Sequence, residues 1–111
     1  MPILRIHAVT CHETSDGFGA DDLFINFRGE RVFGVQQIDA GQTINPGVNA
    51  FFFIRGGVDF WERDSASDND YLGGFIVHRN QISKGELTAQ LSGDDSDYTV
   101  TYQVLADDAD K

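Results

Sequence analysis

Short segments in which apolar and polar residues alternate recur along almost the whole chain, and they constrain the fold more than any other feature. Eight such segments can be recognised, at residues 3–11, 22–28, 31–37, 43–54, 57–62, 71–79, 86–91 and 98–105. In the last segment Val100, Tyr102 and Val104 would lie on one face, because successive side chains of a strand point to opposite sides. The connections are short and rich in Gly, Asp and Ser, and no apolar stripe of helical period competes with the alternation. The pattern predicts an all-β fold, an antiparallel sandwich of about eight strands.

The size and composition of the chain fit one domain of this kind. With 111 residues it is long enough for a single hydrophobic core. Nine Phe, three Tyr and one Trp supply bulky core side chains, while twelve Gly and only two Pro suit strands joined by tight turns. We expect a single sandwich domain over residues 1–106, followed by an acidic, frayed tail at 107–111.

The charge of the chain narrows the classes of partner. The formal net charge is −10, from 18 acidic and eight basic residues, and the basic residues form no run. Nucleic-acid phosphates and anionic membranes both attract strongly basic surfaces. The composition therefore argues against nucleic-acid binding and against unaided binding to an anionic membrane.

Neither a transmembrane segment nor a signal peptide is predicted, so a soluble protein is expected. The longest apolar stretch, AFFFI at 50–54, is far shorter than a bilayer-spanning helix, and MPILRIHAV at the N-terminus lacks a long apolar region. The single cysteine, Cys11, excludes an internal disulfide and is expected to be buried at a strand end.

The acidic residues are concentrated in alternate connections. If successive strands run antiparallel along a sandwich, connections after odd-numbered strands meet at one end and the others at the opposite end. The first set contains one basic residue, Arg63, and these acidic residues: Glu13, Asp16, Asp21, Asp22, Asp39, Glu62, Asp64, Asp68, Asp70, Asp94, Asp95 and Asp97. The second set contains Arg28, Arg31, Arg55, Arg79 and Lys84 against Glu30 and Glu86. We expect a strongly dipolar molecule whose acidic loops gather at one end.

Crowded carboxylates of this kind indicate a divalent cation, because they repel one another unless a cation lies between them. Calcium accepts six to eight oxygen ligands in a tolerant geometry, magnesium requires a stricter octahedron, and zinc prefers His and Cys. In WERDSASDNDYLGG, at 61–74, Glu62 and Asp64 are two residues apart on one face of a strand end, and Asp70 follows a polar turn. An EF-hand frame does not fit, since the required Gly at position six and Glu at position twelve are missing.

These residues resemble the calcium loops of C2 domains, which are eight-stranded β-sandwiches that bind lipids or proteins in a calcium-dependent way. The third calcium loop of that family reads approximately D-x-D-x5-D-[FYL]-[IL]-G, and ERDSASDNDYLG matches it with Glu62 in place of the first Asp. GFGADDLFI looks like a looser version of the end of the first loop, with Asp21 at the aspartate position. By this resemblance the calcium loops would be residues 12–22, 38–43 and 62–70, all at the acidic end.

The resemblance implies a set of calcium ligands in these loops. The first candidates are Asp16, Asp21, Glu62, Asp64 and Asp70, and the second candidates are Glu13, Asp22, Asp39 and Asp68. Phe18, between two glycines, is a candidate for a membrane or partner contact, with folding back onto the sandwich as the alternative. The GDDSD turn at 93–97 is interpreted as a plain hairpin connection, with Gly and Asp there for turn geometry.

Three hypotheses of function remain at this point. The histidines show no catalytic arrangement, so we expect a non-enzymatic module that binds Ca²⁺ and then engages an anionic lipid headgroup or a protein partner. Calcium at loosely formed sites would suit the extracellular space. The alternative is a metal-independent structural or protein-interaction sandwich, as part of a secreted or surface assembly. A weaker alternative is an acidic protein that mimics nucleic acid.

Overall fold

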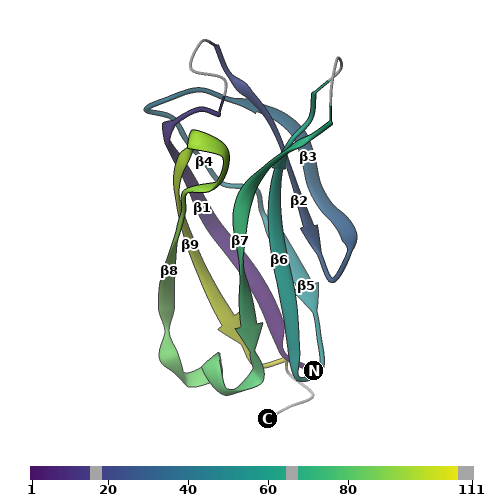
Figure 1. Ribbon diagram of the computed structural model, residues 1–111. Helices are drawn as coiled ribbons and strands as arrows, with labels where there is room; N and C mark the ends of the chain where they lie inside the picture. The colour runs from purple at the N-terminus through teal and green to yellow at the C-terminus, as the bar shows by residue number, and fades with distance from the viewer. Residues whose placement is uncertain (16–18, 65–67, 108–111) are drawn as a thin grey trace.

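The computed structural model describes residues 1–15, 19–64 and 68–107, which form two antiparallel sheets packed face to face (Figure 1). The elements are β1 (Ile3–Glu13), β2 (Asp21–Phe27), β3 (Glu30–Ile38), β4 (Thr43–Ile44), β5 (Val48–Phe51), β6 (Arg55–Glu62), β7 (Asp70–His78), the 3-10 helix η1 (Arg79–Lys84), β8 (Glu86–Leu91), the 3-10 helix η2 (Gly93–Asp95) and β9 (Asp97–Leu105). One sheet has the order β4-β1-β9-β8, with β5 also pairing with β1, and the other has the order β3-β2-β6-β7. None of the described helices is long and apolar enough to cross a membrane. The all-β sandwich expected from the sequence is confirmed.

The strand expected at residues 43–54 is in fact two short strands, so the strand count is nine rather than eight. The interruption lies at Asn45-Pro46-Gly47. Pro46 has no N–H to donate to a ladder, and Gly47 has a φ of 66°, which an L side chain rarely adopts. The Gly47 N–H donates to the Asn45 side-chain oxygen at 2.9 Å, which closes the turn locally. Each remaining strand begins and ends within two residues of its expected position.

The core lies between the two sheets and is rich in aromatic side chains. The largest fully buried side chains include Tyr98, Phe52 and Phe60. Phe75 on β7 stacks on Tyr102 on β9 with ring centroids 4.5 Å apart, so these rings join the two sheets directly. Full burial of a large apolar side chain contributes about 1.5–3 kcal/mol, and stacked rings add to this. Packing of aromatic and aliphatic side chains between the sheets therefore forms the core of the sandwich.

The second sheet contains backbone irregularities that depend on glycine. The register shifts twice between β2 and β3 and once between β6 and β7. Gly34 in β3 has a φ of 104° and Gly73 in β7 a φ of 123°. A Cβ atom at Gly34 would also lie 2.5 Å from the carbonyl oxygen of Leu23. Such bulges bend and twist a strand, and here they need residues without a side chain.

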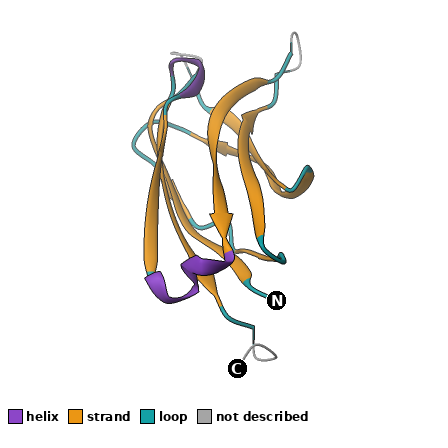
Figure 2. Ribbon diagram, turned by 60° about the horizontal axis from the view of Figure 1, so that its bottom comes forward, coloured by secondary structure: helices purple, strands orange, loops and turns teal. Residues whose placement is uncertain are grey.

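The acidic connections lie together at one end of an elongated molecule. Strands β1, β3 and β6 all end at the top of Figure 1, with η2 beside them. Helix η1, the N-terminus and the end of β9 lie at the opposite end, which Figure 2 brings forward. The extents are 47 × 24 × 18 Å, so the two ends are separated along the long axis. The expectation that the acidic loops gather at one end is confirmed.

Candidate metal centre

Three carboxylates meet at the acidic end, where β6 leads into β7. Glu62 is the last residue of β6, Asp70 is the first of β7, and the two are paired across the ladder. Asp64 follows β6 by two residues. One carboxylate oxygen of each of these residues lies within 4.8 Å of the others. The strand pair thus fixes two members of the group, and the start of the connecting loop supplies the third.

Backbone hydrogen bonds anchor this loop to the neighbouring strand. The Arg63 N–H donates to the carbonyl oxygen of Asp22 at 2.9 Å, and the Asp64 N–H donates to the side-chain oxygen of Asn69 at 3.0 Å. The Asp22 N–H approaches a carboxylate oxygen of Glu62 at 3.5 Å. Glu62 itself is only 5% exposed. The group therefore contains one buried carboxylate, Glu62, and hydrogen bonds hold the residues that directly follow β6.

The acidic surroundings make the charged form of Asp70 unfavourable. Desolvation raises the pKa of the Asp70 carboxyl above its ordinary value, and the neighbouring Asp94 carboxyl raises this pKa further. Repulsion from Asp64 acts in the same direction, whereas a hydrogen bond with Glu62 lowers the pKa. A cation among these groups would remove the repulsion.

Asp94 is a fourth carboxylate of this end, and it comes from η2 rather than from the three expected loops. A Cβ atom at Gly93 would lie 2.5 Å from the carbonyl oxygen of Tyr71, so η2 packs directly on the start of β7. The Gly93 carbonyl oxygen accepts hydrogen bonds from both the backbone N–H and the hydroxyl of Ser96. The interpretation of GDDSD as a plain hairpin turn missed the contact of Asp94 with Asp70. The signal that could have found it was the strand parity, which already placed this turn at the acidic end.

Asp21 lies in a buried hydrogen-bond network at the base of the same end. Its side chain is fully buried. Its carboxylate accepts a hydrogen bond from the Tyr98 hydroxyl at 2.5 Å, and others from the Ser15 hydroxyl at 2.8 Å and the Ser15 N–H at 3.1 Å. Burial raises the pKa of the Tyr98 phenol and that of the neighbouring Cys11 thiol, which is buried as expected. Among the described residues, the group of three close carboxylates does not include Asp21.

The other candidate residues are distributed around this end. Asp16 and Phe18 lie outside the described residues. Glu13, Asp39 and Asp68 are exposed, and the Asp39 carboxylate accepts a hydrogen bond from the next backbone N–H in its own turn at 2.8 Å. Within the part of the chain that is described, the group of three contains none of the second candidates.

The geometry and chemistry of Glu62, Asp64 and Asp70 suit a hard cation. Their ligand atoms are all carboxylate oxygens, which calcium prefers, whereas zinc favours nitrogen and sulfur. Two oxygens on opposite sides of a calcium ion, each about 2.3–2.6 Å from it, would be about 4.6–5.2 Å apart. The observed limit of 4.8 Å is therefore compatible with one ion between these three groups.

Comparisons with known proteins concern the fold. No family model matches the chain, and no curated protein matches it in sequence. The fold is similar to that of a solved structure described as "Structure of a C2 domain", with a TM-score of 0.66 and 12% sequence identity. The similarity covers 96% of this chain and 100% of that chain. This chain therefore has the fold of a divergent, C2-like β-sandwich.

Proposed function

We propose that this protein is a non-enzymatic calcium-binding module whose acidic end holds the ion among Glu62, Asp64 and Asp70. The observation that carries the proposal is the approach of three carboxylate oxygens to within 4.8 Å of one another. The raised pKa of Asp70 supports it, because desolvation and the neighbouring Asp94 and Asp64 carboxyls disfavour the charged form, which a bound cation would stabilise. Asp94 lies beside Asp70 and would act as a further ligand.

The remaining coordination positions would come from neighbouring loops, water or a partner. Asp16 and Asp21, in loop 12–22, are the next candidates by resemblance to C2 domains, and Asp21 would first have to exchange its Tyr98 and Ser15 donors. Asp64 and Asp70 are only partly buried, so the site faces solvent. A phosphate oxygen of an anionic lipid or a carboxylate of a protein partner could then complete the coordination. Open sites of this type have calcium dissociation constants of about 10⁻⁴–10⁻³ M in extracellular modules, which suits an extracellular location.

Thermal unfolding with and without calcium tests this proposal. A ligand that binds only the folded state stabilises it by about 2.7 kcal/mol at a hundredfold excess over its dissociation constant. We expect millimolar calcium to raise Tm clearly and magnesium to raise it much less. The double variant Asp64→Asn plus Asp70→Asn should lose this response, and Asp94→Asn should weaken it.

Glu86→Gln is the matched control, because Glu86 is an exposed carboxylate at the start of β8, at the opposite end of the sandwich. Its calcium response should equal that of the unmodified protein. A melting temperature that is the same in calcium and in chelator, for the unmodified protein, would overturn the proposal.

The second candidate function is a metal-independent interaction sandwich. It is favoured by the Asp21 network, in which protein donors satisfy a buried carboxylate without any ion. In that case the acidic end would serve solubility or meet a basic partner directly. Unchanged unfolding in calcium, together with binding to a basic protein that weakens as salt rises, would favour this function.

A further inference from the structure

The end opposite the acidic loops carries exposed apolar side chains in one short turn. Phe51, Phe53 and Ile54 are 53%, 62% and 72% exposed, whereas Phe52 between them is fully buried. Packing in the core thus explains only the central residue of the FFF run. Exposed apolar side chains that gather at one place mark a binding surface more often than scattered ones do.

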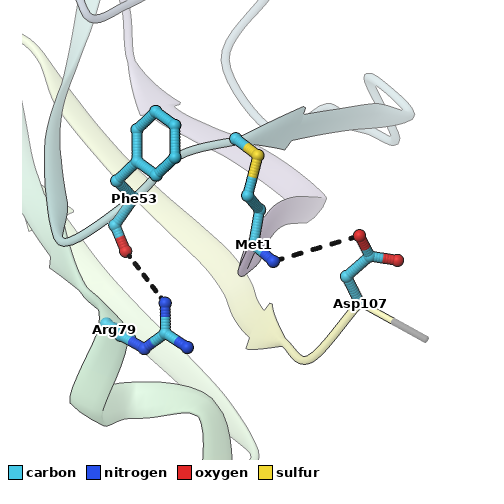
Figure 3. Close-up of polar contacts among 4 residues, drawn as sticks. All are labelled: Met1, Phe53, Arg79 and Asp107. Atoms are coloured by element: carbon cyan, nitrogen blue, oxygen red, sulfur yellow. Dashed lines mark hydrogen bonds and ion pairs between the residues drawn. The ribbon is translucent and has the colours of Figure 1, made fainter. Parts of the chain in front are cut away.

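Arginine side chains border this turn. The backbone N–H of Arg79 donates to the carbonyl oxygen of Ile54 at 2.8 Å, so η1 begins directly beside the turn. A guanidinium nitrogen of Arg79 lies 3.5 Å from the carbonyl oxygen of Phe53, and Figure 3 shows the Phe53 ring directed away from this contact. Arg55 follows Ile54 in sequence and is exposed. Apolar rings and cationic groups are therefore presented side by side.

A hollow of about 440 Å³ lies next to the turn and combines the same two chemistries. It is lined by Ile54, His78, Arg79, Asn80 and Ile82. Two isoleucines give it apolar walls, and Arg79 gives it a cationic group. Anionic lipids are complementary to this combination, because a negatively charged phosphate lies next to the start of an apolar acyl chain.

The net charge of the protein does not prevent such binding, because the acidic loops are far from this turn. The long axis of the molecule is 47 Å, whereas the Debye length at physiological ionic strength is about 8 Å. Repulsion between the acidic end and an anionic membrane is therefore largely screened. The described part of the opposite end carries Arg28, Arg31, Arg55, Arg79 and Lys84 against Glu30, Glu86 and Asp107. This small excess of positive charge favours an anionic surface, and apolar insertion would supply most of the affinity.

We infer that this end docks on membranes that contain anionic lipid, with Phe53 and Ile54 inserted among the headgroups and Arg55 and Arg79 on lipid phosphates. Phe51 would contact the same surface from the end of β5. Exposed apolar side chains bordered by arginines are the combination by which surface elements insert among headgroups and attract anionic lipid, which favours a membrane over a protein partner. The interaction needs no calcium and is separate from the proposed calcium site, because it uses the other end of the molecule.

Vesicle co-sedimentation in EDTA tests this inference directly. We expect binding to phosphatidylcholine vesicles that contain phosphatidylserine, and weaker binding to phosphatidylcholine alone. The double variant Phe53→Ser plus Ile54→Ser should bind about tenfold more weakly, since two inserted apolar side chains are lost. Arg79→Gln should reduce the preference for the anionic vesicles.

Tyr71→Ser is the control, because Tyr71 is 41% exposed but lies at the start of β7, at the acidic end of the sandwich. This variant should bind as the unmodified protein does. Failure to sediment with either kind of vesicle in EDTA would overturn the inference, as would binding that appears only with calcium and is lost in Asp64→Asn plus Asp70→Asn. Capture of a soluble protein through Phe53 and Ile54 without vesicle binding would also overturn it. An unchanged Tm in calcium would remove only the proposed calcium site.

Discussion

Replacement of Asp70 by Asn is expected to have opposite effects on stability without and with calcium. In chelator the Asp70 carboxylate has oxygens of Glu62 and Asp64 within 4.8 Å, and its pKa is raised by desolvation and by Asp94. Removing this one charge removes the repulsions with Asp64 and Asp94 while the shape of the side chain is kept. The variant should therefore be more stable than the unmodified protein when no divalent cation is present.

The size of this gain follows from the observed separation. Two unit charges 4.8 Å apart repel by about 0.9 kcal/mol at the dielectric constant of water, which is the scale of the Asp64 repulsion, and the Asp94 carboxylate adds to it. Salt screening and the loss of the hydrogen bond between Asp70 and Glu62 both reduce this value. We expect a net stabilisation of about 1 kcal/mol at low salt, which corresponds to a rise in Tm of about 4–6 °C for a domain of this size.

Calcium should reverse the order of stability. Saturating calcium would stabilise the unmodified protein by about 2.7 kcal/mol at a hundredfold excess over its dissociation constant, and the Asn variant would gain much less. Urea unfolding at low salt, in EDTA and in calcium, measures both differences, with Glu86→Gln as the control for an exposed carboxylate. A variant that is less stable than the unmodified protein in EDTA, with an unchanged m value, would refute the argument from charge repulsion.

Three further perturbations have defined outcomes. Tyr98→Phe removes a buried donor to the Asp21 carboxylate and should cost about 2 kcal/mol in urea unfolding, since hydrogen bonds to charged groups contribute about 1.5–3 kcal/mol; a loss below about 0.5 kcal/mol would contradict this role. In the folded state the pKa of the Tyr98 phenol is raised, and that of the Tyr71 phenol is raised to about 12. The two phenols therefore contribute to the free energy of unfolding fully below the unfolded-state pKa of about 10, and this contribution is lost as pH rises above it. Between pH 8 and 11.5 the free energy of unfolding should thus fall as pH rises, and it should fall less steeply in Tyr98→Phe. Equal slopes in the two proteins would contradict a raised pKa for Tyr98. Gly93→Ala should destabilise the protein by about 2 kcal/mol, because its Cβ would lie 2.5 Å from a carbonyl oxygen. Gly57→Ala is the control and should have the smaller effect, since a Cβ there would have nothing within 4 Å. Equal losses of stability would contradict a close contact at Gly93.

The strand pattern could be predicted from the sequence because it depends on local alternation. Each inner-face side chain of β9, for example, is separated from the next by one residue, and burial follows that spacing. The error at residues 43–54 has a local cause too, since Pro46 and Gly47 interrupt a run whose two halves pair with the same strand, β1. Pro46 and Gly47 are turn residues, but the apolar residues on both sides of them favour one continuous strand.

The site could be predicted only where it depends on neighbours in sequence. Glu62, Asp64 and Asp70 come together because a strand end and the return of the chain place them there. The environment of Asp21 depends on Tyr98, 77 positions away, so no motif around Asp21 could indicate its hydrogen bond. The approach of Asp94 to Asp70 likewise depends on the packing of η2 on β7.

The irregular strands of the second sheet have a consequence for how copies of this protein behave toward one another. β3 and β7 are the two outer strands of that sheet. A regular outer strand presents a row of unpaired backbone groups on which another chain can add by edge-to-edge pairing, the first step of β-aggregation. The register shifts beside β3 and β7, with Gly34 and Gly73 at positive φ, break this row on both sides. We therefore expect the same glycines that let the sheet bend to oppose fibre-like association in concentrated solutions of this protein.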